Sequence, residues 1–268
     1  MADAPQIPGT HVDLGHAMIT MVEPTRDAAR LREYNRWYEH DHAYSGVMIG
    51  PWAFAHRRWV ATRALKDLRV PHASTVATPV DRGSFIAFYW YLKDHVDDHF
   101  TWAFPQTKWL TDQGRMNGDR MHVSTSLYDF AGAVNRPAWP VPAEIALDHP
   151  YAGLVVTWLE RADDAVNDDV VAWALRDWAP TRLTADSPVA QALVFTPRDF
   201  PGIPGSGVGV GTRVCVAWLL QRDPRDVWAT HGAELVDDVA TARVATLGLA
   251  APFVPVVAGT ETYLDELW

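Results

Sequence analysis

The sequence predicts an α+β protein in which two fused βαββαβ units pack sheet to sheet. Strand-like and helix-like segments follow one another in the same order in both halves of the 268-residue chain. A proline-rich segment, residues 135–150, lies between the halves and lacks the periodicity of a helix or a strand. Each sheet would have helices on one face only, so the two bare faces must bury each other.

The first half, residues 1–134, carries a strand, a helix, two strands, a helix and a final strand. Ser84–Leu92 (SFIAFYWYL) is a dense run of aromatic and β-branched residues, which strands favour. The first helix begins at Pro24, and proline is tolerated in a first helical turn. The expected elements are His16–Val22, Pro24–Tyr44, Ala53–Thr62, Ser84–Leu92, Asp94–Met116 and Met121–Ala131.

The second half, residues 151–268, repeats this order, which is that of the split βαβ or ferredoxin-like unit. A Gly- and Pro-rich loop, Pro197–Gly211, interrupts it. This loop lacks the Lys-Ser/Thr pair of a phosphate-binding loop, so we expect a flexible hairpin-like loop that could cover a site. The expected elements are Tyr151–Glu160, Asp163–Trp178, Val189–Thr196, Thr212–Leu220, Asp223–Ala242 and a last strand within Phe253–Tyr263. The second half is expected to be mainly structural.

Charge and cysteine content exclude several functions. The chain has 23 Lys and Arg against 33 Asp and Glu, a formal charge of −10, which disfavours nucleic acid and anionic membranes as partners. The longest weakly polar run, Gly248–Gly259, is too short to cross a bilayer. Met1–Val12 lacks the features of a signal peptide. Cys215 is the only cysteine and lies in an apolar run, so it predicts a core residue in a cytoplasmic protein without internal disulfides.

The stretch Asn35–Trp59 (NRWYEHDHAYSGVMIGPWAFAHRRW) resembles the helix-to-strand segment of the dimeric α+β barrel superfamily, especially its EthD-like branch. The residues that match W-Y-x-x-E-H, P-G-F and R-R-aromatic in that pattern, with Asp for Glu and Trp for Gly, are Trp37, Tyr38, Asp41, His42, Pro51, Trp52, Phe54, Arg57, Arg58 and Trp59. The resemblance implies a small cofactor-free enzyme or binding protein for hydrophobic, often aromatic molecules. Such proteins include dehydratases, decarboxylases, isomerases and cofactor-independent monooxygenases, with haem-binding relatives.

His42 is the leading catalytic candidate. Its spacing from Tyr34 and Tyr38 places all three on the helix face that meets the sheet. At a helix C-terminus the dipole would raise the pKa of the imidazole, which suits a general acid/base. Asp41 is an adjacent carboxylate, and either tyrosine could polarise a substrate oxygen. Alternatively, His42 caps the helix end.

The second half differs at the equivalent place. Asp177 and Trp178 stand where Asp41 and His42 stand in the first half. If the halves are duplicates, the second has lost its imidazole. The sequence therefore predicts a working pocket in the first half only.

Thirteen tryptophans are unusual for a chain of this length. Four of them cluster around the ends of elements in the first half: Trp37, Trp52, Trp90 and Trp102. They predict the walls of an apolar substrate pocket near His42, and the alternative is plain core packing.

His95 and His99 are four residues apart on one helix face, a spacing that could bind zinc or iron with a third ligand from elsewhere. The segment lacks the Glu of an H-E-x-x-H motif, so a metal-free helix surface is the alternative. Haem would need an axial histidine beside a large apolar cavity, and several histidines could serve.

The predicted function is a cofactor-independent lyase, dehydratase or isomerase acting on a hydrophobic cyclic or aromatic small molecule. No cofactor or metal is expected, and a homodimer is possible. Three alternatives remain: a cofactor-free monooxygenase, a non-catalytic small-molecule binding protein, and a His-ligated metal or haem enzyme.

Overall fold

The computed structural model describes residues 11–203 and 205–268. Its eight strands are antiparallel to their neighbours and close into one barrel in the order β1-β3-β2-β8-β5-β7-β6-β4. Each half contributes four strands in the same order, β4-β1-β3-β2 and β8-β5-β7-β6, which confirms the predicted duplication of a ferredoxin-like unit. The strands are β1 Leu14–Pro24, β2 Ala53–Val60, β3 Phe85–Leu92, β4 Arg120–Asn135, β5 Gly153–Arg161, β6 Val189–Arg198, β7 Arg213–Leu220 and β8 Ala245–Pro255.

The two sheets also pair at their edges. The edge between β4 and β6 is long and runs from Leu127 to Asn135 on β4. The edge between β2 and β8 is short and involves Trp59 and Val60 on β2. Closure of the barrel leaves no free sheet edge.

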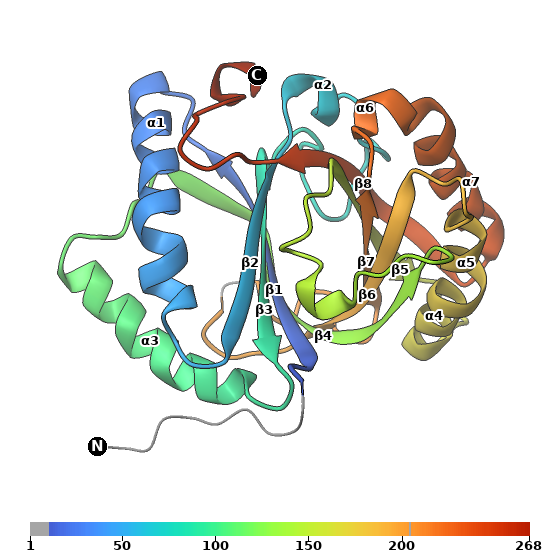
Figure 1. Ribbon diagram of the computed structural model, residues 1–268, viewed down its shortest axis with the longest axis horizontal. Helices are drawn as coiled ribbons and strands as arrows, with labels where there is room; N and C mark the ends of the chain where they lie inside the picture. The colour runs from blue at the N-terminus through green and yellow to red at the C-terminus, as the bar shows by residue number, and fades with distance from the viewer. Residues whose placement is uncertain (1–10, 204) are drawn as a thin grey trace.

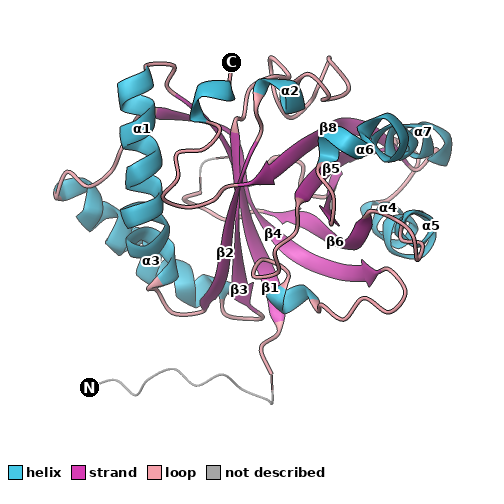
Figure 2. Cartoon of the chain, turned by 45° about the horizontal axis from the view of Figure 1, so that its top comes forward, coloured by secondary structure: helices cyan, strands magenta, loops and turns pink. Residues whose placement is uncertain are grey.

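Helices cover the outside of the barrel on two opposite sides (Figure 1). The helices α1 and α3 lie over the first-half sheet, and α4 to α7 lie over the second-half sheet (Figures 1 and 2). The helices are α1 Ala28–Trp37, α2 Arg63–Lys66, α3 Val96–Asp112, α4 Asn167–Trp173, α5 Ala179–Arg182, α6 Pro224–Val227 and α7 Ala233–Ala242.

The long helices expected from the sequence are interrupted by π-helical turns. Two such turns, Tyr38–His42 and Tyr44–Met48, follow α1; Ala174–Trp178 follows α4, and Trp228–Gly232 lies between α6 and α7. Each inserts an extra residue into the helical repeat, and such turns occur frequently at functional sites. Periodicity of the sequence does not reveal them.

Successive side chains of β3 point to opposite faces of the sheet, one toward the helices and one toward the barrel interior. Phe85 and Tyr89 face the helices, whereas Phe88 and Trp90 face the barrel interior, where the ring of Trp90 lies 5.6 Å from that of Phe195. Every residue of β3 is buried, which explains its continuous apolar sequence.

Three segments differ from the expectation. The first helix begins at Ala28 after its N-cap Asp27, because Pro24 is still the last residue of β1. The last strand, β8, begins at Ala245, eight residues before the predicted Phe253, because its first part pairs with β5 despite the weak strand preference of Gly248. The proline-rich segment 135–150 packs on the barrel, since Ala146 and Leu147 are buried and a short 3₁₀ turn forms at Ala143–Ile145. The boundaries 1–134 and 151–268 remain a prediction.

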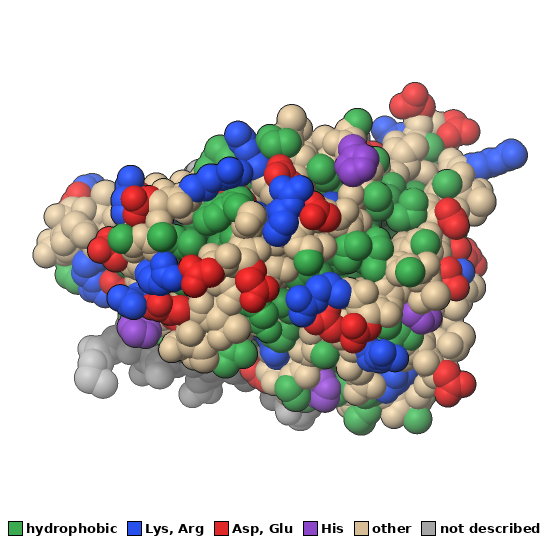
Figure 3. Space-filling model, turned by 90° about the horizontal axis from the view of Figure 1, so that it is seen from above, with side chains coloured by type: hydrophobic (Ala, Val, Ile, Leu, Met, Phe, Trp, Pro, Cys, Tyr) green, Lys and Arg blue, Asp and Glu red, His purple; other side chains and the backbone are tan. Residues whose placement is uncertain are grey.

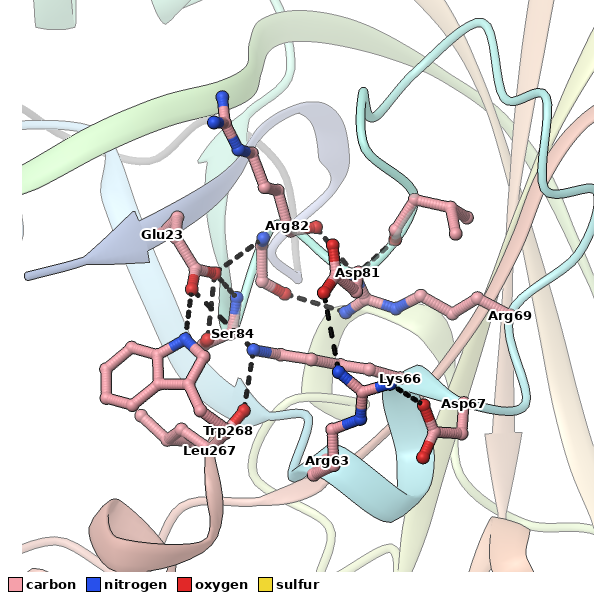
Figure 4. Close-up of polar contacts among 12 residues, drawn as sticks. Glu23, Arg63, Lys66, Asp67, Arg69, Asp81, Arg82, Ser84, Leu267 and Trp268 are labelled. Carbon is pink, nitrogen blue, oxygen red and sulfur yellow. Dashed lines mark hydrogen bonds and ion pairs between the residues drawn. The ribbon is translucent and has the colours of Figure 1, made fainter. Parts of the chain in front are cut away.

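The final residues of the chain pack on the first half through a buried polar network (Figure 4). Glu23 accepts hydrogen bonds of 2.8 Å from Trp268 Nε1 and from the backbone and hydroxyl of Ser84. Lys66 Nζ donates to the carbonyl of Leu267 at 2.9 Å.

Charged side chains of both signs alternate across the face shown in Figure 3. Among the described residues, no helix has the length and apolar character needed to span a membrane. Of Met1–Val12, where no signal peptide was expected, residues 1–10 lie outside the described residues. A cytoplasmic location remains a prediction.

Candidate functional site

A cavity lies in the first half between the outer face of the sheet and its covering helices. The space accessible to the centre of a water molecule is about 210 Å³. The total empty space, which includes open solvent at the mouth, is about 990 Å³. Its walls are mainly apolar and aromatic, as in most small-molecule sites. The aromatic residues on the wall are Tyr34, Tyr38, Phe85, Tyr89, Phe100 and Phe104.

The second half supplies part of the cover. Gly202 and Ile203, from the loop between β6 and β7, line the cavity. The neighbouring Phe200 packs on Phe100, with ring centroids 4.9 Å apart. The loop expected to cover a site therefore does so.

His42 faces this cavity at the end of the first π-helical turn. Its ring stacks on Trp37 with a centroid distance of 4.4 Å and meets the edge of Tyr38 at 5.7 Å. Nδ1 is buried and has no hydrogen-bond partner. Burial, reinforced by the charge of Arg120, lowers the pKa of His42 to about 3.

Two expectations for His42 are therefore wrong. Its pKa is lowered rather than raised, because desolvation outweighs any helix-dipole effect and because a second helical turn, Tyr44–Met48, follows it. It is also not a C-cap, since its ring turns toward the cavity. The imidazole is neutral at pH 7.

Tyr38 lines the cavity and forms a hydrogen-bonded network with Tyr89 and His56. Its hydroxyl lies 2.5 Å from that of Tyr89 and 3.3 Å from His56 Nε2. Burial raises the pKa of both tyrosines and lowers the pKa of His56 to about 4. All three groups are therefore uncharged at neutral pH and form a polar network without net charge.

Arg58 brings a positive charge to the same wall. Its Nη1 donates to Asn35 Oδ1 at 2.7 Å, and its guanidinium carbon lies 3.8 Å from the ring centroid of Phe85 and 4.2 Å from that of Tyr38. Nη2 is buried without a partner. The hydroxyl of Tyr34, a fully buried residue on α1, also has none.

His99 reaches the cavity from α3. Its Nδ1 lies 2.6 Å from the carbonyl oxygen of Pro51, so Nδ1 carries the hydrogen and donates it. Nε2 is consequently a free acceptor, and it is buried without a partner. Burial lowers the pKa of His99, which keeps this lone pair available at neutral pH.

The structure does not bring Asp41 into the cavity. Its carboxylate accepts a 2.6 Å hydrogen bond from Ser45 Oγ and forms an ion pair with Arg115 on the outer side of the helix. Both contacts lower the pKa of Asp41. Asp41, a catalytic candidate in the sequence, thus lies outside the cavity, because neighbouring residues of a helix point in different directions.

The predicted tryptophan wall is also wrong, because none of the four indoles lines the cavity. Trp37 supports His42 from outside, and Trp52 stacks on His95 at 4.0 Å. Trp90 lies on the barrel side of β3, and Trp102 packs against Gly50. Tyrosine and phenylalanine form the wall instead.

His95 and His99 do not form a metal site together. His95 precedes α3, and its Nδ1 lies 3.1 Å from Asp98, whereas His99 is buried at the cavity. Within residues 11–203 and 205–268, no three His, Cys, Asp or Glu side chains are grouped so that they could hold a metal ion.

Sequence reasoning missed Arg58 and Tyr89 as site residues and saw Arg58 only as part of a motif. Alternation would have placed His56 with Arg58 on one face of β2, and Tyr89 with Phe85 on one face of β3. Which face meets the helices depends on barrel closure, which the sequence does not show.

No family model matches the chain, and no curated protein matches it either. Solved structures do match. An anthrone oxidase-like protein has a TM-score of 0.55 at 9% identity, over 91% of this chain and 92% of that one. A dye-decolorizing peroxidase from Bacteroides thetaiotaomicron has a TM-score of 0.51 at 11% identity, over 91% of this chain and 93% of that one. A Rhodococcus jostii DypB variant in complex with heme has a TM-score of 0.50 at 10% identity, over 94% of this chain and 96% of that one.

These comparisons contradict the predicted cofactor-independent lyase, dehydratase or isomerase. Structures with this fold include peroxidases, one of them in complex with heme, and so they agree with the haem alternative. At such low identity the likeness establishes the fold. The chain has the fold of the dimeric α+β barrel superfamily, with two ferredoxin-like units fused in one polypeptide.

Proposed function

We propose that the protein is a haem-dependent oxidoreductase in which His99 would hold haem at the first-half cavity. The observation that carries this proposal is the buried Nε2 of His99, a residue that lines the cavity: this nitrogen has no hydrogen-bond partner, while Nδ1 donates to Pro51. Metal-binding histidines commonly have this arrangement, because the hydrogen bond at one nitrogen orients the ring and makes the other a better donor.

The other residues present also suit haem. The aromatic wall can pack against a flat macrocycle, and Arg58 and Arg120 can balance the charge of its carboxylates. The space accessible to the centre of a water molecule, about 210 Å³, lies below the range of about 300–1,000 Å³ for small-molecule sites, so haem would fit only with part of the ring in the open mouth. Binding therefore requires the macrocycle to enter from the open mouth, beneath the loop that carries Gly202 and Ile203.

Bound haem would supply electron transfer and oxygen or peroxide chemistry at its iron. The chain would supply the surroundings. His42 is neutral at pH 7, so its unpartnered Nδ1 can accept a hydrogen bond from a substrate hydroxyl, but a pKa of about 3 makes it too weak a base to hold the proton. The hydroxyl of Tyr34 can donate a hydrogen bond to a substrate oxygen, and the apolar wall excludes water.

Titration of the purified protein with hemin, followed by visible absorption, tests the proposal. We expect saturation at one haem per chain. His99→Ala should change the spectrum and weaken binding at least about tenfold, and added imidazole should restore the spectrum. His95→Ala is the matched control, because it removes a nearby imidazole that does not reach the cavity. The absence of saturable binding, or a His99→Ala spectrum identical to that of the parent, would refute the proposal.

A further inference from the structure

A second hollow, the outer hollow, lies in the first half beside the start of α1. The space in it that is accessible to the centre of a water molecule is about 480 Å³, within the range of about 300–1,000 Å³ for small-molecule sites. Its described lining includes four arginines and two acids, although the chain as a whole has a formal charge of −10. These charged residues are Glu23, Arg26, Arg30, Arg82, Asp119 and Arg120. The local charge is therefore opposite to that of the protein.

Both acids of the outer hollow already have partners. Glu23 accepts a hydrogen bond of 2.8 Å from Trp268 Nε1, and its carboxylate lies 3.7 Å from Lys66 Nζ. Asp119 forms an ion pair with Arg30 through both of its carboxylate oxygens. The two acids thus balance Lys66 and Arg30, and the charges of the other three arginines are not matched.

Two of these arginines, Arg26 and Arg82, are exposed to solvent. Neither forms an ion pair with a carboxylate of the described residues. Arg26 lies over the ring of Trp268 at 5.5 Å, and Arg82 Nη1 approaches only the sulfur of Met121, at 3.9 Å. In Figure 4 the guanidinium of Arg82 points away from the polar network around it. A ligand in the outer hollow can therefore reach both guanidinium groups.

The third arginine, Arg120, lines the outer hollow and the first-half cavity alike. Its Nη1 donates to the backbone carbonyl of Asn117, and its guanidinium carbon lies 4.9 Å from the ring centroid of Trp37. These contacts orient the side chain without neutralising its charge. A ligand bound in the outer hollow would therefore lie next to the cavity.

A phosphoryl group suits three unmatched guanidinium groups better than a single carboxylate does. It carries a charge of about −1.5 to −2 at pH 7 and offers three acceptor oxygens. Arginine binds such a group through paired N–H donors. A long polyanion such as nucleic acid is disfavoured, because the protein as a whole is acidic. The chemistry therefore favours a small phosphorylated molecule.

We propose that Arg26, Arg82 and Arg120 bind a small molecule with one or two phosphoryl groups in the outer hollow. This site is separate from the haem site of the proposed function and does not depend on haem. Only Arg120 is shared between the charged residues of the two hollows.

Calorimetric titration with pyrophosphate, at neutral pH and low ionic strength, tests the outer hollow. We expect saturable binding of one pyrophosphate per chain. Arg82→Gln and Arg120→Gln should each weaken it at least about tenfold, because a charge-assisted hydrogen bond is lost. Arg176→Gln is the matched control, since it removes the same charge from an exposed position in the second half.

Three results would overturn the proposal. They are the absence of saturable binding by the parent protein, parental affinity in Arg82→Gln protein, and tighter binding of a short oligonucleotide than of pyrophosphate. A loss of affinity in Arg176→Gln as large as that in Arg82→Gln would also overturn it, because the effect would then be one of net charge.

Hemin titration separates this site from the proposed function. Arg82→Gln should keep the parental hemin affinity and spectrum, because Arg82 does not line the cavity. Loss of hemin binding in this variant would overturn the assignment of a separate site. Failure of the haem proposal would be seen as the absence of a spectrum that depends on His99, while pyrophosphate still bound to the parent and not to Arg82→Gln protein.

Discussion

Trp178 occupies in the second half the position that His42 occupies in the first. Each ends a π-helical turn and stacks on a tryptophan five residues earlier, His42 on Trp37 at 4.4 Å and Trp178 on Trp173 at 4.7 Å. The indole of Trp178 is buried against Trp218, with centroids 4.6 Å apart. The predicted loss of the second imidazole is thus confirmed, and an indole takes the space.

Replacement of His42 by Trp should therefore close the cavity without unfolding the protein. An indole at this position has a precedent in the second half, and it would remove a buried imidazole nitrogen that lacks a partner. We expect hemin binding to be lost and the free energy of unfolding to stay within about 1 kcal/mol of the parent. Binding of hemin by folded His42→Trp protein with parental affinity would show that His42 does not border the ligand.

The reverse change, Trp178→His, should be costly. It removes an indole from a packed core and breaks the 2.9 Å hydrogen bond from Trp178 Nε1 to Asp238. We expect a loss of about 3 kcal/mol in the free energy of unfolding, measured by urea denaturation. A loss below about 1 kcal/mol would indicate that the second half tolerates an open space.

Stability should fall in mild acid. Burial holds the pKa of His42 at about 3 and that of His56 at about 4, both below the ordinary 6.5. Between pH 6.5 and about 4, these histidines are protonated in the unfolded chain but neutral in the folded one. The free energy of unfolding is therefore highest above pH 6.5 and declines as the pH falls toward 4. Each histidine contributes at most about 1.4 kcal/mol per pH unit. Urea denaturation of haem-free protein from pH 7.5 to 5 should show this slope, and His42→Gln should flatten it. An unchanged slope in His42→Gln would rule out His42 as its source.

Gly202→Ala should disturb the cover of the cavity. At Gly202 a Cβ atom would lie 2.8 Å from the Phe104 ring, and its φ of +97° also disfavours a side chain. Gly211 has a φ of +70° but no atom within 4 Å, so Gly211→Ala isolates the backbone cost of about 1 kcal/mol. We expect faster release of hemin from Gly202→Ala only, measured by transfer to a second haem-binding protein. Equal rates for the two variants would mean that the loop does not retain the ligand.

Asp41→Asn should leave ligand binding unchanged. The carboxylate pairs with Arg115 on the outer side of the helix and does not reach the cavity. Hemin titration should give the parental affinity and spectrum. A change in either would indicate that Asp41 acts on the site through the helix.

The sequence predicts the fold well because strands and helices follow local patterns. The order of elements and the dense strand at Ser84–Leu92 correspond closely to the structure. The site is predicted less well. His42, Tyr34 and Tyr38 do line the cavity, as helical periodicity indicated.

What the sequence misses depends on contacts between distant segments. Trp90 points to the barrel interior rather than the cavity because of the register of β3, and Arg58 reaches the site only through the orientation of β2. The depressed pKa of His42 reflects burial by other elements. Pattern alone carries no information on such contacts.

The loop from β6 to β7 has a consequence for any attempt to divide the polypeptide. Residues 1–134 alone would retain both histidines and Arg58 but would lack Gly202 and Ile203 above them. Phe100 and Phe104 would lose their ring contacts with Phe200, and the buried Phe100 would become exposed to solvent. A fragment of residues 1–134 would therefore expose the apolar walls of the cavity to solvent and would tend to aggregate. The two halves are expected to be needed together for a stable site.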